Sequence, residues 1–118
     1  MTAQIVTAVM DEWRAGIDAH DPARVAAVFT EDAVFQGLRP YGVGHDTVAE
    51  YYDSQPRGMT VTYQVLESRR PAADVVFGYV RATFAFEERE DLELFIGVIL
   101  TRTAEHWQIA QYQASRVD

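Results

Sequence analysis

Cysteine is absent from the 118-residue chain. Its absence excludes disulfide frameworks, iron–sulfur clusters and thiolate zinc sites. The three histidines lie far apart in the sequence and form no metal-binding pattern such as HExxH. We therefore expect neither a metal ion nor a cofactor. A chain without cysteine is also consistent with a cytoplasmic location, which we take as the expectation.

Long apolar runs are also missing. No apolar stretch reaches the roughly 18 residues that a membrane-spanning helix requires. The first residues lack the basic segment and apolar segment of a signal peptide, so we expect no leader. Basic residues are scarce, because 10 arginines or lysines face 18 acidic residues and give a net charge of −8. Such a surface repels phosphate backbones and anionic lipids, which argues against nucleic acid and membrane partners.

Apolar residues are abundant. They make up 48% of the chain, and aromatic residues alone make up 12%. This content excludes a disordered chain, and the length suits one core rather than two. We therefore expect a single domain over residues 1–118.

The first half of the chain predicts three helices. Residues 3–19 carry apolar side chains at steps of three and four, which is typical of an amphipathic helix. Asp21 and Pro22 provide an N-cap and a first helical residue for a second helix over residues 22–29, which Thr30, Glu31 and Asp32 should end. A third helix is predicted over residues 45–54.

The remaining segments predict strands. A short strand is expected over residues 33–36, followed by a glycine-rich loop over 37–44. Four long strands are predicted over 59–69, 75–86, 92–103 and 107–116 from their alternation and their β-branched and aromatic content. Helices in one block and strands in another indicate an α+β fold. Strands of this length must twist. We expect a cone-shaped, curved antiparallel sheet packed on the three N-terminal helices (a cystatin-like α+β barrel) that encloses an apolar pocket.

Four segments carry a family resemblance: residues 13–21, 28–35, 42–48 and 107–115. They resemble the end of the first helix, the stretch into the first strand, the start of the third helix and the last strand of the nuclear-transport-factor-2-like superfamily. Within it, the chain is similar to SnoaL-like and SgcJ/EcaC-type small bacterial proteins. The resemblance spans nearly the whole chain. It implies the cystatin-like fold, but this superfamily includes isomerases, cyclases, dehydratases, epoxide hydrolases and proteins without catalytic activity.

The resemblance also allows the family's catalytic positions to be located. The steroid-isomerase branch places a tyrosine, a carboxylate base and a second acid where this chain has Trp13, Gly37 and approximately Ile96. Glycine and isoleucine supply neither a base nor an oxyanion donor. Ketosteroid isomerase activity is therefore not expected.

Polar anchors are predicted on the last strand instead. If Ile109 faces inward, strict alternation directs Gln111 and Gln113 into the pocket as well. Glutamine can donate and accept hydrogen bonds, but it is no base at neutral pH. Together with aromatic walls, the candidate ligand-binding residues are Trp13, Tyr41, Tyr52, Tyr63, Gln111 and Gln113. Core packing is the competing interpretation for Trp13, and surface or dimer packing is the one for Tyr52. For Tyr41 the alternative is a plain loop aromatic, and for Tyr63 the sequence leaves both faces of the sheet open.

The two central strands are apolar on both faces. In residues 92–102, Leu94, Ile96 and Val98 share one face while Phe95 and Ile99 occupy the other. A strand that faced water on one side should alternate with polar residues. We therefore expect a homodimer through the convex face of the sheet.

Two functions follow from these features. The first is an enzyme that binds a small hydrophobic metabolite in an internal pocket and isomerises, cyclises or dehydrates it. The second is a ligand-binding or assembly domain without catalytic activity, because the aligned positions carry no acid or base.

Overall fold

Helices cover one face of a curved, open sheet in the computed structural model, which describes residues 2–118. The elements of this part of the chain are α1 (Thr2–Asp18), α2 (Pro22–Ala26), β1 (Phe29–Gln36), β2 (Gly42–Val43), α3 (His45–Asp53), β3 (Thr60–Ala72), β4 (Val75–Ala85), β5 (Leu92–Thr103) and β6 (His106–Arg116). The sheet has the order β2-β1-β6-β5-β4-β3. The predicted α+β class and cystatin-like architecture are confirmed.

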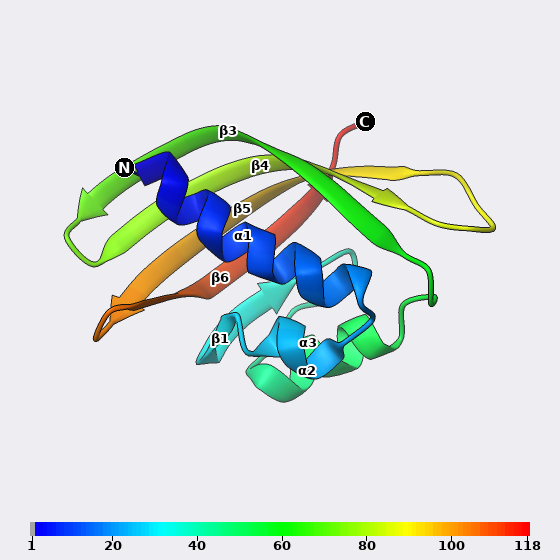
Figure 1. Cartoon of the computed structure of the whole chain (residues 1–118), viewed down its shortest axis with the longest axis horizontal. Helices are drawn as coiled ribbons and strands as arrows, with labels where there is room; N and C mark the ends of the chain where they lie inside the picture. The colour runs from blue at the N-terminus through cyan, green and yellow to red at the C-terminus, as the bar shows by residue number, and fades with distance from the viewer. Residues whose placement is uncertain (1) are drawn as a thin grey trace.

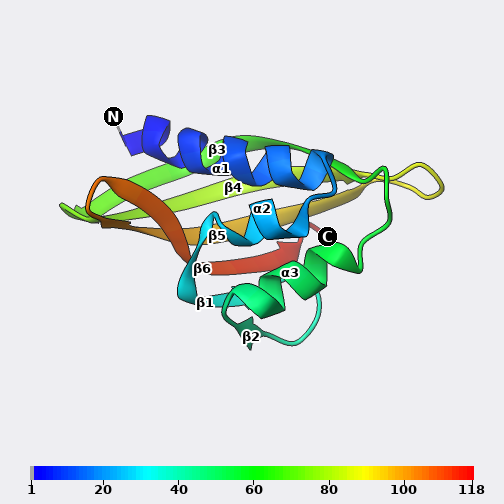
Figure 2. The same cartoon turned by 60° about the horizontal axis from the view of Figure 1, so that its bottom comes forward.

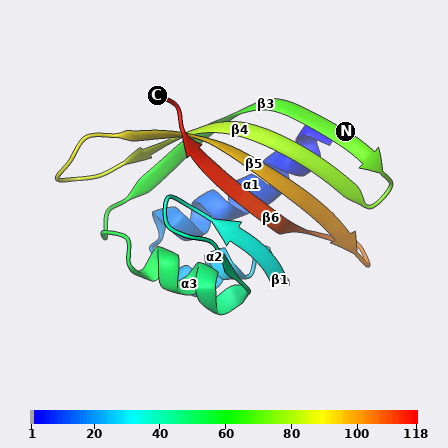
Figure 3. The same cartoon turned by 180° about the vertical axis from the view of Figure 1, so that it is seen from behind.

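The three helices lie on the concave face of the sheet. Helix α1 runs along β3 and β4, whereas α2 and α3 lie at the β1 end (Figures 1 and 2). Seen from behind, the strands lie in front of the helices, so the helices of the described part of the chain leave the outer face uncovered (Figure 3). None of the helices within residues 2–118 is long and apolar enough to cross a membrane. The cytoplasmic location stays a prediction.

Close packing fixes the corner between α1 and α2. The predicted apolar stripe of α1 is buried, and Gly16 follows it into the core. A Cβ atom on Gly16 would lie 2.7 Å from Cγ2 of Val25, so only glycine permits this approach of the two helices. Asp21 caps α2 as expected, because its Oδ1 accepts a hydrogen bond of 3.1 Å from the backbone N–H of Arg24.

The boundary between the second helix and the first strand was predicted wrongly. Helix α2 ends at Ala26 rather than residue 29, and β1 starts at Phe29 rather than residue 33. The apolar spacing of Val25, Val28 and Phe29 suits a helix locally, but Phe29 pairs with Ile109 of β6. Pairing between distant segments therefore overrides the local helical pattern, and residues 30–32 lie within the strand.

Two further details of the sheet differ from the expectation. The pairing of β1 with β6 is parallel, whereas β3, β4, β5 and β6 are antiparallel neighbours. The glycine-rich segment 37–44 contains the two-residue strand β2, which pairs with Val34 and Phe35 of β1. The four long strands themselves lie within three residues of their predicted bounds.

Candidate functional site

A groove of about 700 Å³ lies between α1, the segment around α2 and the start of β6. We call it the α1–β6 groove. Its volume falls in the range of small-molecule sites. Its walls are mostly apolar, with a few charged or polar groups at the ends. The lining residues are Gln4, Ile5, Ala8, Val9, Glu12, Arg24, Ala27, Val28, His106 and Trp107.

Helix periodicity explains the α1 wall of the groove. The lining positions 4, 5, 8, 9 and 12 recur at steps of one, three and four and so form one helix face. This face is rotated from the buried stripe, since Ala8 is exposed while Val9 is buried. The opposite wall is Trp107, which pairs with Arg102 of β5 on the inner face of the sheet.

An ion pair closes one end of the groove. Nε of Arg24 lies 2.7 Å from Oε2 of Glu12 and so joins α2 to α1. The hydrogen bond from Arg24 holds the pKa of Glu12 below its usual range. Both side chains are about half exposed. A carboxylate held in this way accepts a proton less readily than a free one.

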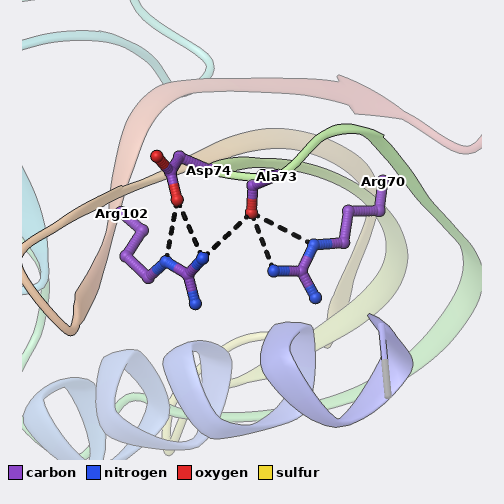
Figure 4. Close-up of polar contacts among 4 residues, drawn as sticks. All are labelled: Arg70, Ala73, Asp74 and Arg102. Atoms are coloured by element: carbon purple, nitrogen blue, oxygen red, sulfur yellow. Dashed lines mark hydrogen bonds and ion pairs between the residues drawn. The ribbon is translucent and has the colours of Figure 1, made fainter.

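Two arginines stand at the Trp107 end. The Cζ atom of Arg102 lies 5.0 Å from the centre of the Trp107 ring, and that of Arg70 lies 5.5 Å from it. Both guanidiniums donate to the carbonyl oxygen of Ala73 in the β3–β4 turn, and Arg102 also donates to Asp74 at 2.9 Å (Figure 4).

The expected internal pocket is filled by side chains. The space between α3 and the sheet measures only about 20 Å³. Three rings occupy the interior: Nε1 of Trp13 donates to the hydroxyl of Tyr52 at 3.1 Å, and that hydroxyl donates to Tyr112 at 3.5 Å. The ring of Phe35 stacks on Tyr112 at 4.7 Å. A ligand-sized space is therefore found beside α1 and not inside the cone.

The interior hydroxyls are poor acids. Burial raises the pKa of Tyr52 and of Tyr112, because a phenolate in the core would lose its hydration. Both tyrosines consequently remain neutral hydrogen-bonding groups at physiological pH. No carboxylate or histidine among the described residues lines this small cavity. Within residues 2–118, no three histidine, aspartate or glutamate side chains are grouped to hold a metal ion.

The aromatic candidates from the sequence lie outside the groove. Trp13 is fully buried and Tyr52 is 4% exposed, so both belong to the core. Tyr63 faces Trp13 and its hydroxyl donates to Oδ1 of Asp11 at 2.6 Å. Tyr41 is 65% exposed in the loop before β2. Their roles as ligand contacts stay predictions.

The orientation predicted for the two glutamines is wrong. Ile109 faces inward and is fully buried, yet Gln111 and Gln113 are exposed on the outer face. The cause is a β-bulge in β6: Leu100 pairs with Ile109, but the next β5 residue back, Ile99, pairs with Gln111. The extra residue, Ala110, reverses the alternation, so that Tyr112 and Ala114 point inward in place of the glutamines.

Trp107, which lines the groove, and Arg70 and Arg102, which lie against its ring, were not among the sequence-based candidates. Trp107 stood in the segment that resembles the family's last strand. Only the strand register brings them together, because β5 places Arg102 opposite Trp107 and the β3–β4 turn supplies Ala73.

The positions aligned with the steroid isomerases carry no catalytic group. Ile96 is fully buried in the core. A Cβ atom on Gly37 would lie 2.5 Å from the hydroxyl oxygen of Tyr51, so the Tyr51 ring occupies the space that a side chain at residue 37 would need. This arrangement leaves no room for a carboxylate at that position without displacement of Tyr51.

Comparison with known proteins places the fold in a family. The family described as SnoaL-like domain matches residues 6–118. No curated protein matches the chain. Among solved structures, a ketosteroid isomerase-like protein from Erwinia carotovora is 24% identical with a TM-score of 0.83, and the match covers 98% of this chain and 95% of that one.

Two other similar structures come from proteins without a stated function. An NTF-2-like protein from Shewanella oneidensis is 12% identical with a TM-score of 0.84 over 98% of this chain and 99% of that one. A domain with a cystatin-like fold from Nostoc punctiforme is 17% identical with a TM-score of 0.84 over 98% and 76%. At these identities the likeness concerns the fold alone. The chain belongs to the family of SnoaL-like domains and has the nuclear-transport-factor-2-like fold.

Proposed function

We propose that the protein binds a small hydrophobic molecule in the α1–β6 groove. The observation that carries the proposal is a mostly apolar groove of about 700 Å³ beside an interior that is closed to ligands. Apolar walls with few polar groups are typical of small-molecule sites. The groove thus takes the place of the internal pocket expected from the sequence.

Binding without chemistry is the function that the geometry supports best. Proton transfer would need a base in the groove, and Glu12 is engaged by Arg24. His106 is the one observation that favours an isomerase, cyclase or dehydratase, because it lines the groove and an imidazole can serve as a general acid or base. In an enzyme, His106→Gln would abolish turnover and leave binding intact.

The two tryptophans offer a test of the binding proposal. Their indole N–H groups should give two separate signals in a ¹⁵N–¹H correlation spectrum, one from buried Trp13 and one from Trp107 in the groove wall. Titration with decan-1-ol should shift the Trp107 signal and leave the Trp13 signal in place. A shift confined to Trp13 would instead locate the ligand in the interior and contradict the proposal.

A pair of variants controls for non-specific effects. Ala8 is exposed and lines the groove, so Ala8→Trp should fill it without touching the core. Ala3 is an exposed α1 residue outside the lining, and Ala3→Trp serves as the matched control. We expect Ala8→Trp to abolish decan-1-ol binding and Ala3→Trp to preserve it. Equal binding by both variants would rule out this groove.

We also propose that two copies pair through the outer face of the sheet. The rings of Phe77, Tyr79 and Phe95 stack there at 6.5 and 5.6 Å, and Phe77 is 37% exposed. An apolar surface of this kind on a sheet without covering helices is typical of an interface (Figure 3).

Sedimentation velocity at micromolar concentration tests the pairing. We expect a dimer for the unmodified chain and a monomer for Phe77→Asp. Tyr41→Asp, at an exposed aromatic residue in the loop before β2 rather than on β4 or β5, should stay dimeric. A monomeric unmodified chain would refute the pairing.

A further inference from the structure

We infer that the ligand of the α1–β6 groove is an amphipathic anion, with an apolar body in the groove and an acidic group at Arg70 and Arg102. The inference rests on the proposed function, and it adds the chemical class of the ligand. It follows from three features of the Trp107 end: the position of the two guanidiniums, their unused donors and their local charge.

The position of the guanidiniums links them to the groove. Trp107 lines the groove, and its ring lies 5.0 Å from the Cζ atom of Arg102 and 5.5 Å from that of Arg70. Both cations therefore lie against a residue of the groove wall, at the Trp107 end. Figure 4 shows the two guanidiniums next to one another below the β3–β4 turn, on the side of the sheet that α1 covers.

Hydrogen bonds fix the orientation of both guanidiniums and leave one nitrogen of each without a partner among the described residues. Nε and Nη2 of Arg70 both donate to the Ala73 carbonyl, at 3.2 and 2.7 Å. In Arg102, Nε donates to Oδ1 of Asp74 and Nη2 donates to the Ala73 carbonyl. The remaining nitrogen of each guanidinium, Nη1, makes no hydrogen bond to the described residues and points toward α1 (Figure 4). Two fixed guanidiniums with free N–H groups suit the oxygens of a carboxylate.

The local charge is positive on an acidic protein. Asp74 pairs with Arg102 at 2.8 Å, but Arg70 forms no ion pair with any carboxylate within residues 2–118. The three groups together carry one net positive charge, whereas the chain as a whole carries −8. Among the described residues, Glu105, exposed in the β5–β6 turn, and His106, in the groove lining, directly precede Trp107 in the chain. An anionic ligand would therefore find its favourable contacts here, and a cationic one would not.

Three probes of equal chain length separate the headgroup from the apolar body. Decanoate, decan-1-ol and decylammonium can be titrated below their micelle concentrations while the Trp107 indole signal is followed. We expect decanoate to bind about tenfold more tightly than decan-1-ol, as charge-assisted hydrogen bonds to arginine should provide. Raising the salt concentration should weaken decanoate binding only.

Neighbouring arginines provide the matched controls. Arg70→Gln should bring decanoate affinity down to that of decan-1-ol, and Arg102→Gln should lower it while leaving decan-1-ol unchanged. Arg69→Gln should retain the preference, because Arg69 pairs with Glu67 at 2.7 Å and lies opposite Phe77 on the outer face. Circular dichroism would verify that each variant is folded.

The outcomes distinguish the two proposals. Equal binding of decanoate and decan-1-ol at Trp107 would overturn the anionic ligand and leave the groove as a site for neutral molecules. An unchanged preference in both Arg70→Gln and Arg102→Gln would overturn the assigned residues. Absence of any Trp107 shift with all three probes would overturn the proposed function itself, and this inference with it.

Discussion

Alkaline pH should destabilise the protein through its buried tyrosines. Tyr52 and Tyr112 fill the interior, and burial raises the pKa of both hydroxyls. The chain has no cysteine and no lysine, since all ten of its basic residues are arginines. Tyrosines are therefore the side chains that titrate near pH 10. A rise from pH 8 to pH 11 perturbs them selectively.

The sign and size of the change in the free energy of unfolding follow from proton linkage. In the unfolded chain each tyrosine titrates near pH 10, while in the folded chain Tyr52 and Tyr112 titrate higher. Their stabilisation is thus complete below about pH 10 and is lost as the pH rises toward the folded pKa. At pH 11 each contributes a loss of about 1.4 kcal/mol, or about 2.8 kcal/mol for the pair. This loss is a large part of the 5–15 kcal/mol that is typical of a domain.

Urea unfolding at pH 8, 10 and 11 measures this loss. Tyr112→Phe should reduce the difference between pH 8 and pH 11 by about 1.4 kcal/mol, because one linked proton is gone. Tyr52→Phe should do the same, with an added cost at pH 8 because the Trp13 N–H loses its acceptor. Tyr41→Phe, at a position 65% exposed, should leave the difference unchanged. If Tyr41→Phe matched Tyr112→Phe, or if the unmodified chain were equally stable at pH 8 and pH 11, the linkage to the interior would be refuted.

Three further predictions concern single positions. Gly16→Ala should lower the free energy of unfolding by about 1–2 kcal/mol in urea, because its Cβ would lie 2.7 Å from Val25 and overpacking outweighs the gain in helix propensity; an unchanged midpoint would contradict the close contact. Asp21→Ala should cost about 1 kcal/mol in the same assay by removing the cap of α2. Gln113→Ala should leave the Trp107 titration with decan-1-ol unchanged, since Gln113 lies on the outer face; weaker binding would contradict that placement.

Local patterns predicted most of the fold because each element has a strong period. The stripe of α1 and the alternation of β4 and β5 determine both the element type and the buried face. The predictions were wrong where pairing between distant segments determines the secondary structure. The strand character of Phe29 depends on Ile109, 80 positions further along the chain, and no local signal separates it from the preceding helix.

One residue decided the prediction for the candidate site. Strict alternation in β6 would have directed Gln111 and Gln113 inward, but Ala110 adds one residue opposite the bond between Ile99 and Leu100. A bulge has no sequence signature in a strand of ordinary composition, so its position follows only from the partner strand. With Tyr112 as the inward residue, the same strand predicts an interior filled by an aromatic ring rather than a polar pocket.

The filled interior also explains why a groove outside the cone is the better candidate. A curved sheet over helices leaves a cavity only if the side chains are too small to fill it, and here Trp13, Tyr52 and Tyr112 meet across that space through hydrogen bonds. Opening it for a ligand would break those bonds and expose apolar rings, whereas the α1–β6 groove is already open to solvent between surface residues. Binding beside α1 therefore costs less free energy than binding in the interior. Substitutions of Ala8, Arg70 and Arg102 should consequently affect ligand binding more than substitutions in the aromatic core.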